Sequence, residues 1–244
     1  MGLLSNKISK EELQVGDHIY SWRPCYSYAH HGIYIGDNKV INFTARAGGE
    51  EGMRGILNNL LISSLPQKSF QHCSECSQNM ENTNGVVVSC LDCFFHGRPI
   101  HRFEYGVDTK TFLAQARGGT CTFAHADPIE DVLHRALFLW ENGFGGYHLF
   151  SNNCEDFAIY CKTGLLLTSQ SMGGRSGQIA TNFLTIPLSV SSIYLAGLPT
   201  AVGIYCVSRY LKDLGIRRDV IKVPVEDLAI NLGWSRSSIT NDQT

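Results

Sequence analysis

Alternating apolar and polar positions predict β-strands in the first half of the chain. The turn signal Gly36-Asp37-Asn38 separates two of the apolar runs, and this arrangement is typical of a β-hairpin. Residues 46–70 contain four glycines and no clear period, so we expect a loop there. The predicted strands are residues 17–22, 32–35, 39–43, 86–88 and 100–105.

Helical spacing of apolar residues predicts a helix that begins after Asp127-Pro128 and ends at Gly143. Aspartate at the N-cap, proline at the first helical position and Glu130 at the third are start signals, and glycine is a common stop. We expect this helix to bury the apolar residues at helical spacing, which are Ile129, Val132, Leu133, Ala136, Leu137 and Trp140.

A second helix is predicted to begin with Cys154 and to end at Gly164. Asn152 or Asn153 can cap it. Main-chain N–H groups and the positive end of a helix dipole favour a thiolate over a thiol. Cys154 is therefore a candidate nucleophile, which requires a histidine base from elsewhere in the fold. The simpler alternative is a buried structural cysteine.

Charge and cysteine content narrow the class of protein. The chain has 244 residues, a formal net charge of −2 and no basic run. This length suits one sizeable core with additions, or two small domains, and the charge argues against nucleic-acid binding.

Nine cysteines occur without a secretory signal. We therefore expect a cytoplasmic, reducing environment, where paired cysteines indicate metal rather than disulfides.

Two Cys-x-x-Cys pairs lie 13 residues apart, namely Cys73 with Cys76 and Cys90 with Cys93. Each short loop delivers two thiolates to one side of a tetrahedral ion, so we predict a structural Zn²⁺ site in a cysteine-rich insertion over residues 70–100. The alternatives are metal-free loop cysteines, or a redox dithiol without the usual βαβ surroundings. Three histidines lie near enough in sequence to replace one cysteine: His72, His96 and His101.

No charged residue occurs in the 33 residues from 176 to 208. This run exceeds the roughly 20 residues that span the hydrocarbon core of a bilayer. Basic residues follow it, so a re-entrant hairpin broken near residues 197–199 would keep both flanks in the cytoplasm, as the positive-inside rule prefers. We expect residues 176–208 to anchor the chain at a membrane and residues 209–244 to form a C-terminal tail. The alternative is a buried pair of soluble helices.

Two blocks of sequence carry a family resemblance. The first runs from His30-His31-Gly32-Ile33-Tyr34-Ile35 to Gly36-Asp37 and follows Val15-Gly16-Asp17-His18-Ile19-Tyr20. The second is Asn153-Cys154-Glu155-Asp156-Phe157. In this order they resemble the LRAT-type family, which comprises lecithin:retinol acyltransferase and the H-Rev-type phospholipid acyltransferases and is related to the NlpC-type cysteine peptidases. The resemblance is strongest to the plant proteins with an NC domain.

The resemblance implies an α+β fold in which an antiparallel sheet packs against the helix that carries Cys154 at its N-terminus, a permuted papain-like arrangement. It also implies a catalytic domain over residues 14–168. The expected substrate is a phospholipid or another acyl-lipid, encountered at a membrane surface.

The choice of base depends on the register of the hairpin. Side chains alternate faces along a strand, so His30 and His31 point in opposite directions. A three-residue turn places Asn42 on the face of His30, whereas a two-residue turn places it on the face of His31, and periodicity does not separate these. The first histidine of the family corresponds to His30, which we therefore expect to be the base. Asn42 replaces the usual second histidine; an amide can orient an imidazole but cannot titrate.

The preferred function is a thiol acyltransferase or phospholipid hydrolase. Cys154 would form an acyl-thioester, with His30 as base and later acid and Asn42 as its orienting partner. Main-chain N–H groups of Asn153 or Cys154 are the expected oxyanion donors. One alternative is a catalytically weak adaptor that uses the zinc insertion and the tail for interaction. Another is a thiol peptidase or amidase.

Overall fold

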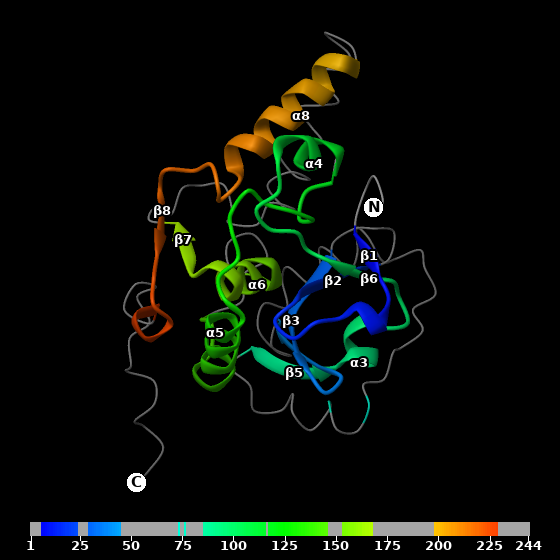
Figure 1. Cartoon of the computed structure of the whole chain (residues 1–244), viewed down its shortest axis with the longest axis vertical. Helices are drawn as coiled ribbons and strands as arrows, with labels where there is room; N and C mark the ends of the chain where they lie inside the picture. Colours follow the sequence, from blue (N-terminus) through cyan, green and yellow to red (C-terminus); the bar gives the residue numbers. More distant parts are fainter. Residues whose placement is uncertain are drawn as a thin grey trace, which may run out of the picture.

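The computed structural model describes residues 6–23, 29–44, 73, 76, 85–115, 117–145, 153–167 and 198–228. Its centre is a six-stranded sheet in the order β1-β6-β2-β3-β4-β5, with antiparallel neighbours throughout (Figure 1). The strands are β1 (Lys7–Ile8), β2 (His18–Trp22), β3 (Ala29–Gly36), β4 (Lys39–Phe43), β5 (Val86–Cys90) and β6 (Ile100–Arg102). The expected α+β class and antiparallel sheet are thus confirmed, while the loop expected over residues 46–70 lies outside the described residues.

The hairpin between β3 and β4 closes through a two-residue turn. Asp37 and Asn38 both have positive φ, at 48° and 60°, as tight hairpin turns require. A bulge between Tyr34 and Gly36 then adds one residue to β3, so that Gly32 lies opposite Asn42. The three-residue turn that we considered is therefore wrong, but the bulge restores the same register. Asn42 consequently shares a face with His30.

Different helices cover the two faces of the sheet. Ile33 and Ile41 pack on one face against Phe157 and its neighbours on two helices. Val40 packs on the other face against Phe94 of a short helix. Figure 1 shows these helices on opposite sides of the strands. The first pair is α5 (Ile129–Asn142) and α6 (Cys154–Thr163), and the short helix is α3 (Leu91–Phe95).

The second cysteine pair belongs to the main sheet. Cys90 is the last residue of β5, and Cys93 lies in α3. The chain then enters β6, which pairs with β1 and β2. Residues 85–102, the second part of the cysteine-rich insertion predicted over residues 70–100, therefore form part of the central sheet and its covering helix.

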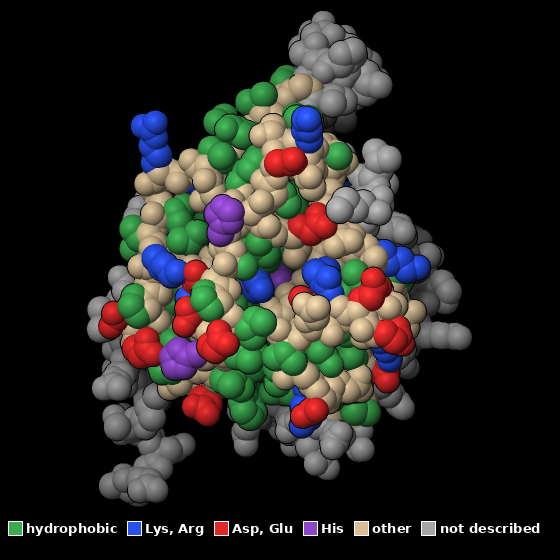
Figure 2. Space-filling model, in the orientation of Figure 1, with side chains coloured by type: hydrophobic (Ala, Val, Ile, Leu, Met, Phe, Trp, Pro, Cys, Tyr) green, Lys and Arg blue, Asp and Glu red, His purple; other side chains and the backbone are tan. Residues whose placement is uncertain are grey.

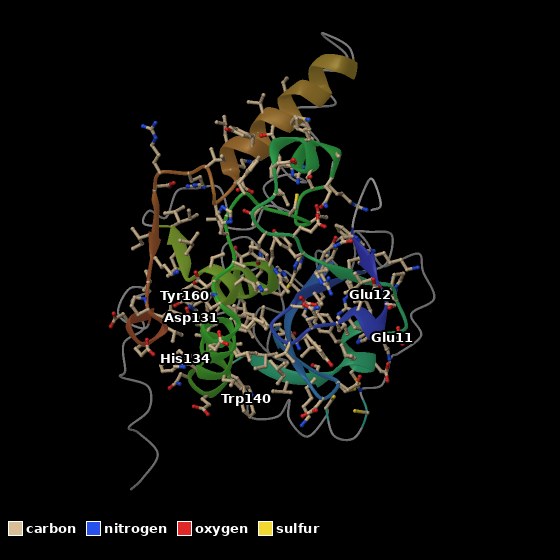
Figure 3. The ribbon with its side chains drawn as sticks, viewed as in Figure 1. Glu11, Glu12, Asp131, His134, Trp140 and Tyr160 are labelled. Atoms are coloured by element: carbon tan, nitrogen blue, oxygen red, sulfur yellow. The ribbon has the colours of Figure 1, made fainter. Side chains whose placement is uncertain are left out.

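Helix α5 begins and ends where the sequence predicts, but two details differ. The N-cap is Pro128, because the Asp127 carboxylate is taken by Arg135 and Lys222. The buried positions are Val132, Arg135, Ala136 and Leu139. Figure 3 shows His134 on the side of this helix that faces away from the sheet. The expected burial of Ile129, Leu137 and Trp140 is wrong, since these side chains are 50 %, 42 % and 44 % exposed.

The C-terminal region contributes to the same core. Strands β7 (Leu165–Leu167) and β8 (Val220–Lys222) form a two-stranded sheet, and Val223 and Leu228 pack in the main cluster. Among the described residues, no helix has the length and apolarity needed to cross a membrane. Most of the predicted apolar segment, residues 176–197, lies outside the described residues. The remaining elements are η1 (Lys10–Glu12), α4 (Thr109–Ala114), α8 (Leu198–Lys212) and η3 (Val225–Asp227).

Buried Arg209 contacts residues 112–121 from the last turn of α8. Its guanidinium donates to the carbonyl oxygens of Phe112 at 2.7 Å and Gln115 at 2.6 Å, and to Cys121 Sγ at 3.2 Å. It also lies 3.9 Å from the centre of the Phe112 ring. A charged residue in this position shows that the last turn of α8 is packed against protein.

Candidate active site

Helix α6 starts on a capping box that fixes the position of Cys154. The Asn153 side chain accepts from the main-chain N–H groups of Glu155 and Asp156, at 2.9 and 3.3 Å. In return, Asp156 accepts from the Asn153 N–H at 3.1 Å. The helix ends at Gly164 in the left-handed conformation, with φ of 66°, where glycine avoids the steric cost. Both predicted ends are confirmed, and Cys154 is the first helical residue.

The Cys154 thiol lies against the main chain of β3. Its sulfur is 3.8 Å from the carbonyl oxygen of Ala29, and the main-chain N–H of His31 hydrogen-bonds to it. Burial, with a smaller contribution from the nearby Glu155 carboxylate, raises the pKa of the thiol to about 12. The expected preference for thiolate is therefore reversed here. The physical reason is that desolvation outweighs the His31 N–H, and Asn153 occupies the next N–H groups of the helix.

His30 and Asn42 form a hydrogen-bonded pair on the face of the sheet that α3 covers. His30 Nε2 is 3.1 Å from Asn42 Oδ1. The Asn42 amide nitrogen lies 3.0 Å from Ser89 Oγ and 3.5 Å from the Val87 carbonyl oxygen. The Val87 carbonyl oxygen can only accept a hydrogen bond, so the Asn42 group that faces it must be the NH₂ group. Asn42 Oδ1 therefore faces His30 and must accept a proton carried by Nε2. The lone pair of His30 is thereby placed on Nδ1. Burial lowers the pKa of His30 well below its ordinary value, so the ring is neutral.

His31 belongs to a different network on the opposite face, beneath α6. Its Nδ1 is 2.8 Å from Nε2 of His18, and Nδ1 of His18 is 2.7 Å from the Tyr105 hydroxyl. Burial lowers the pKa of His31 to about 3 and lowers that of His18 as well. We did not predict this chain of three side chains. The signal was His18 itself, which lies on the same face of β2 as Tyr20, the residue opposite His31.

The structure therefore brings Cys154, His30 and Asn42 to the same end of β3, where His30 and Asn42 contact each other and Cys154 contacts the main chain of the strand. The thiol contacts main-chain atoms on either side of His30, and the His30 ring contacts Asn42 on the α3 side. Arg23, which follows β2, was also missed: its positive charge lowers the pKa of both His30 and Cys154. The arrangement supplies a nucleophile, a neutral imidazole with a defined tautomer, and a nearby cation.

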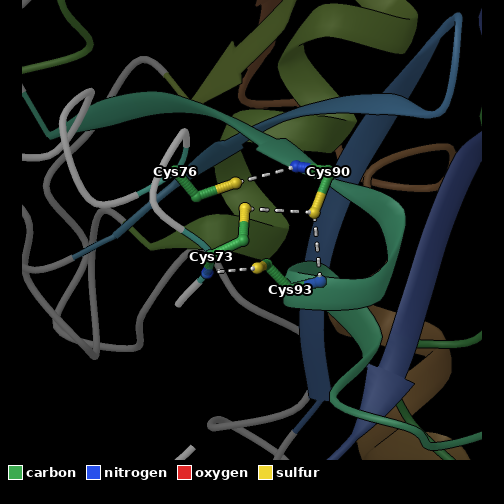
Figure 4. Close-up of side chains that lie close together, drawn as sticks. All are labelled: Cys73, Cys76, Cys90 and Cys93. Carbon is green, nitrogen blue, oxygen red and sulfur yellow. Dashed lines mark hydrogen bonds between the residues drawn. The ribbon is translucent and has the colours of Figure 1, made fainter. Parts of the chain in front are cut away.

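The four predicted cysteines form a second cluster (Figure 4). Their sulfur atoms all lie within 4.8 Å of one another, and Cys73 Sγ is 3.9 Å from Cys90 Sγ. Four sulfurs at about 2.3 Å from a tetrahedral Zn²⁺ would be about 3.8 Å apart. Main-chain N–H groups of Cys90 and Cys73 donate to Cys76 and Cys93 sulfurs, each at 3.3 Å. The donor set and its spacing fit a metal ion. His72 lies outside the described residues, and the described part of the chain places neither His96 nor His101 in this cluster.

Comparison with known proteins agrees with this architecture. The family model described as lecithin retinol acyltransferase matches residues 11–167. The protein LEAD-SENSITIVE 1 of Arabidopsis thaliana is 51 % identical over 240 residues, which cover 95 % of this chain and 92 % of that protein. No solved structure matches the chain. The chain therefore belongs to the lecithin retinol acyltransferase family.

Proposed function

We propose that the protein is a thiol acyltransferase or phospholipid hydrolase with a permuted papain-like active site in residues 14–168. Its family supports acyl transfer or hydrolysis and acts on lipid substrates. The observation that carries the proposal is the His30–Asn42 pair at 3.1 Å, at the end of β3 that the helix-start Cys154 contacts. This is a Cys-His-Asn set in which an amide oxygen defines the imidazole tautomer.

In the proposed reaction, His30 Nδ1 takes the proton of the Cys154 thiol as the sulfur attacks the ester carbonyl of a phospholipid. Because the His30 ring packs against Phe94 on the α3 side of β3 and the thiol contacts the main chain of that strand, the transfer requires the ring to turn toward the sulfur at the end of β3. The lyso-lipid alcohol leaves with that proton, and the acyl group remains on the sulfur as a thioester. An amine, alcohol or water then attacks the thioester and gives its proton to His30, which returns it to the sulfur.

Two features of the structure constrain this reaction. Cys154 is only 5 % exposed, so the ester must displace neighbouring groups to reach its thiol, and proton transfer must accompany attack. The Asn153 N–H donates to Asp156, which leaves the Cys154 N–H as the proposed oxyanion donor of the two that we considered.

The competing assignment makes His31 the base. It rests on the position of His31 on the α6 face and on the bond from its main-chain N–H to the Cys154 sulfur. The test is acyl release or transfer from phosphatidylcholine vesicles, followed by mass spectrometry and normalised to folded protein by circular dichroism. We expect His30→Gln to lower activity on the order of 10²–10⁴-fold and His31→Gln to lower it much less. The reverse ranking would assign the base to His31, and the absence of activity above background in every protein would favour a non-enzymatic adaptor.

We also propose that Cys73, Cys76, Cys90 and Cys93 hold one structural Zn²⁺ and that catalysis needs no cofactor. The support is the set of four sulfurs within 4.8 Å of one another and the preference of Zn²⁺ for four thiolates in structural sites. Elemental analysis of protein purified without chelator should give about one zinc per chain.

We propose further that the protein is cytoplasmic and works at a membrane surface, where its lipid substrates are concentrated. Ile204, Val207 and Leu211 are exposed at helical spacing on α8, and Figure 2 shows hydrophobic side chains along this helix. Ile204 and Val207 belong to the uncharged run over residues 176–208, which is the proposed anchor, and Leu211 follows it directly after Arg209 and Tyr210. Co-sedimentation with liposomes tests this, and protein that remains in the supernatant would count against it.

A further inference from the structure

We propose that the four-cysteine site positions the His30–Asn42 pair, so that metal occupancy controls the active site. The inference rests on the proposed function for the role of His30. Its structural part concerns only how residues next to the cysteines contact this pair.

The first connection runs through β5. Ser89 immediately precedes Cys90, and its hydroxyl oxygen is 3.0 Å from the Asn42 amide nitrogen. Cys90 lies opposite Lys39 in the β4–β5 ladder, and the N–H of Leu91 donates to Asn38 in the hairpin turn at 2.9 Å. The end of β5 therefore fixes both the hairpin and the partner that orients the Asn42 amide.

The second connection runs through α3. Phe94 immediately follows Cys93, is 2 % exposed, and has its ring centre 5.0 Å from that of His30. An added Cβ on Gly32 would lie only 3.0 Å from Phe94 Cε2, which shows how closely α3 packs on β3. Any displacement of α3 therefore changes the environment of the His30 ring.

The cysteine cluster adds to the apolar packing that holds helix α3 on the sheet. It has five residues, far fewer than an isolated helix needs to be stable in water. The Cys90 sulfur caps it by accepting from the Cys93 N–H at 3.5 Å, and Cys93 in turn accepts from the Cys73 N–H. An ion held by all four sulfurs would tie β5 and α3 to residues 73 and 76. Without the ion, the segments that carry Ser89 and Phe94 are no longer held to residues 73 and 76, so both side chains can shift relative to Asn42 and His30.

The opposite face of β3 provides an internal control. His31 contacts His18 and stacks on Tyr20, at 5.3 Å between ring centres. These residues lie on the α6 face, away from α3. Loss of metal is therefore expected to affect His30 and to leave His18 and His31 unchanged, although His30 and His31 are neighbours in sequence.

The experiment uses the full-length protein with ¹³C-labelled histidine. Ring signals are recorded before chelation, after chelation and after Zn²⁺ is added back, with zinc content measured at each step and signals assigned from His30→Gln and His31→Gln. We expect the His30 signal to shift or broaden without metal and to recover with Zn²⁺, while the His18 and His31 signals stay in place. An unchanged His30 signal after zinc loss, equal changes in all three, or protein that never binds zinc would overturn the proposal.

A second pair of variants avoids dependence on the metal-free state. In the zinc-loaded protein, Phe94→Leu should shift the His30 signal and lower acyl transfer by about 10²-fold through misplacement of the base. The matched control is Phe95→Leu, since Phe95 is 3 % exposed and lies in the same helix. Equal effects of the two variants on His30 would overturn the inference. The signals require no turnover, so a His30 response in a protein without acyl transfer would contradict the proposed function and leave the positioning intact.

Discussion

Replacing Gly32 with alanine should destabilise the sheet at the point where the site is assembled. The added methyl carbon would lie 2.6 Å from Val40 Cγ1, 2.9 Å from the Ile41 carbonyl oxygen and 3.0 Å from Phe94 Cε2. The Ile41 oxygen belongs to the paired main chain of β4, so relief requires β3 and β4 to separate or α3 to move. Such overpacking costs about 1–3 kcal/mol, offset by about 0.4–1 kcal/mol from the reduced entropy of the unfolded chain. We expect a net loss of about 1–2 kcal/mol, which for a chain of this size lowers Tm by about 2–8 °C.

Urea denaturation and thermal unfolding at fixed zinc concentration would measure this loss. The control is Gly203→Ala in α8, where an added Cβ has no atom within 4 Å; alanine there should be neutral or stabilising by up to about 1 kcal/mol. A Gly32→Ala protein as stable as the Gly203→Ala protein would refute the close approach of β3 to β4 and α3.

Two further predictions concern buried charge and buried histidines. Burial lowers the pKa of His18 and of His31 in the folded state, whereas on unfolding the pKa of both returns to about 6.5. Because the unfolded chain then binds more protons than the folded protein at low pH, the free energy of unfolding should fall as pH decreases from about 7 to about 5. The expected fall is up to about 1.4 kcal/mol per pH unit for each histidine. Urea titrations across this range should show a smaller slope for His18→Gln than for the unmodified protein; equal slopes would contradict the buried pair. Arg209→Met should lower the free energy of unfolding by about 2–4 kcal/mol in the same assay, because it leaves the Phe112 and Gln115 carbonyl oxygens without their charged donor. Exposed Arg218→Met is the control and should change it by less than about 0.5 kcal/mol; similar losses in both would show that Arg209 is not a buried anchor.

Local signals in the sequence predicted much of this fold because they act over a few residues. The alternating strands, the Asn153 cap and the stops at Gly143 and Gly164 are all present. The bulge between Tyr34 and Gly36 could not be predicted, since one extra residue in β3 leaves the apolar pattern unchanged. Periodicity paired the face of His30 with a three-residue turn and the face of His31 with a two-residue turn, whereas the structure combines the two-residue turn with the face of His30.

Predictions that depend on tertiary partners were less successful. Helix α5 has apolar residues along two stripes, and periodicity alone could not show that Arg135 would be buried by its bonds to Asp127 and the Cys161 carbonyl. Arg209 is a similar case, because hydropathy assigns a charged residue to solvent. The pKa of Cys154 was expected to be low from its place at the helix start, whereas the depth of its burial, which no local pattern encodes, raises it.

Trapping the acyl-enzyme is the most direct test of the proposed chemistry. Full-length protein is mixed with phosphatidylcholine vesicles, quenched in acid and digested, and the peptide that contains Cys154 and Cys161 is sequenced by mass spectrometry. We expect one acyl group in thioester linkage on Cys154, absent in Cys154→Ala and retained in Cys161→Ala. An unmodified Cys154 under conditions in which the protein releases fatty acid, or an acyl group that persists on this peptide in Cys154→Ala, would contradict the account.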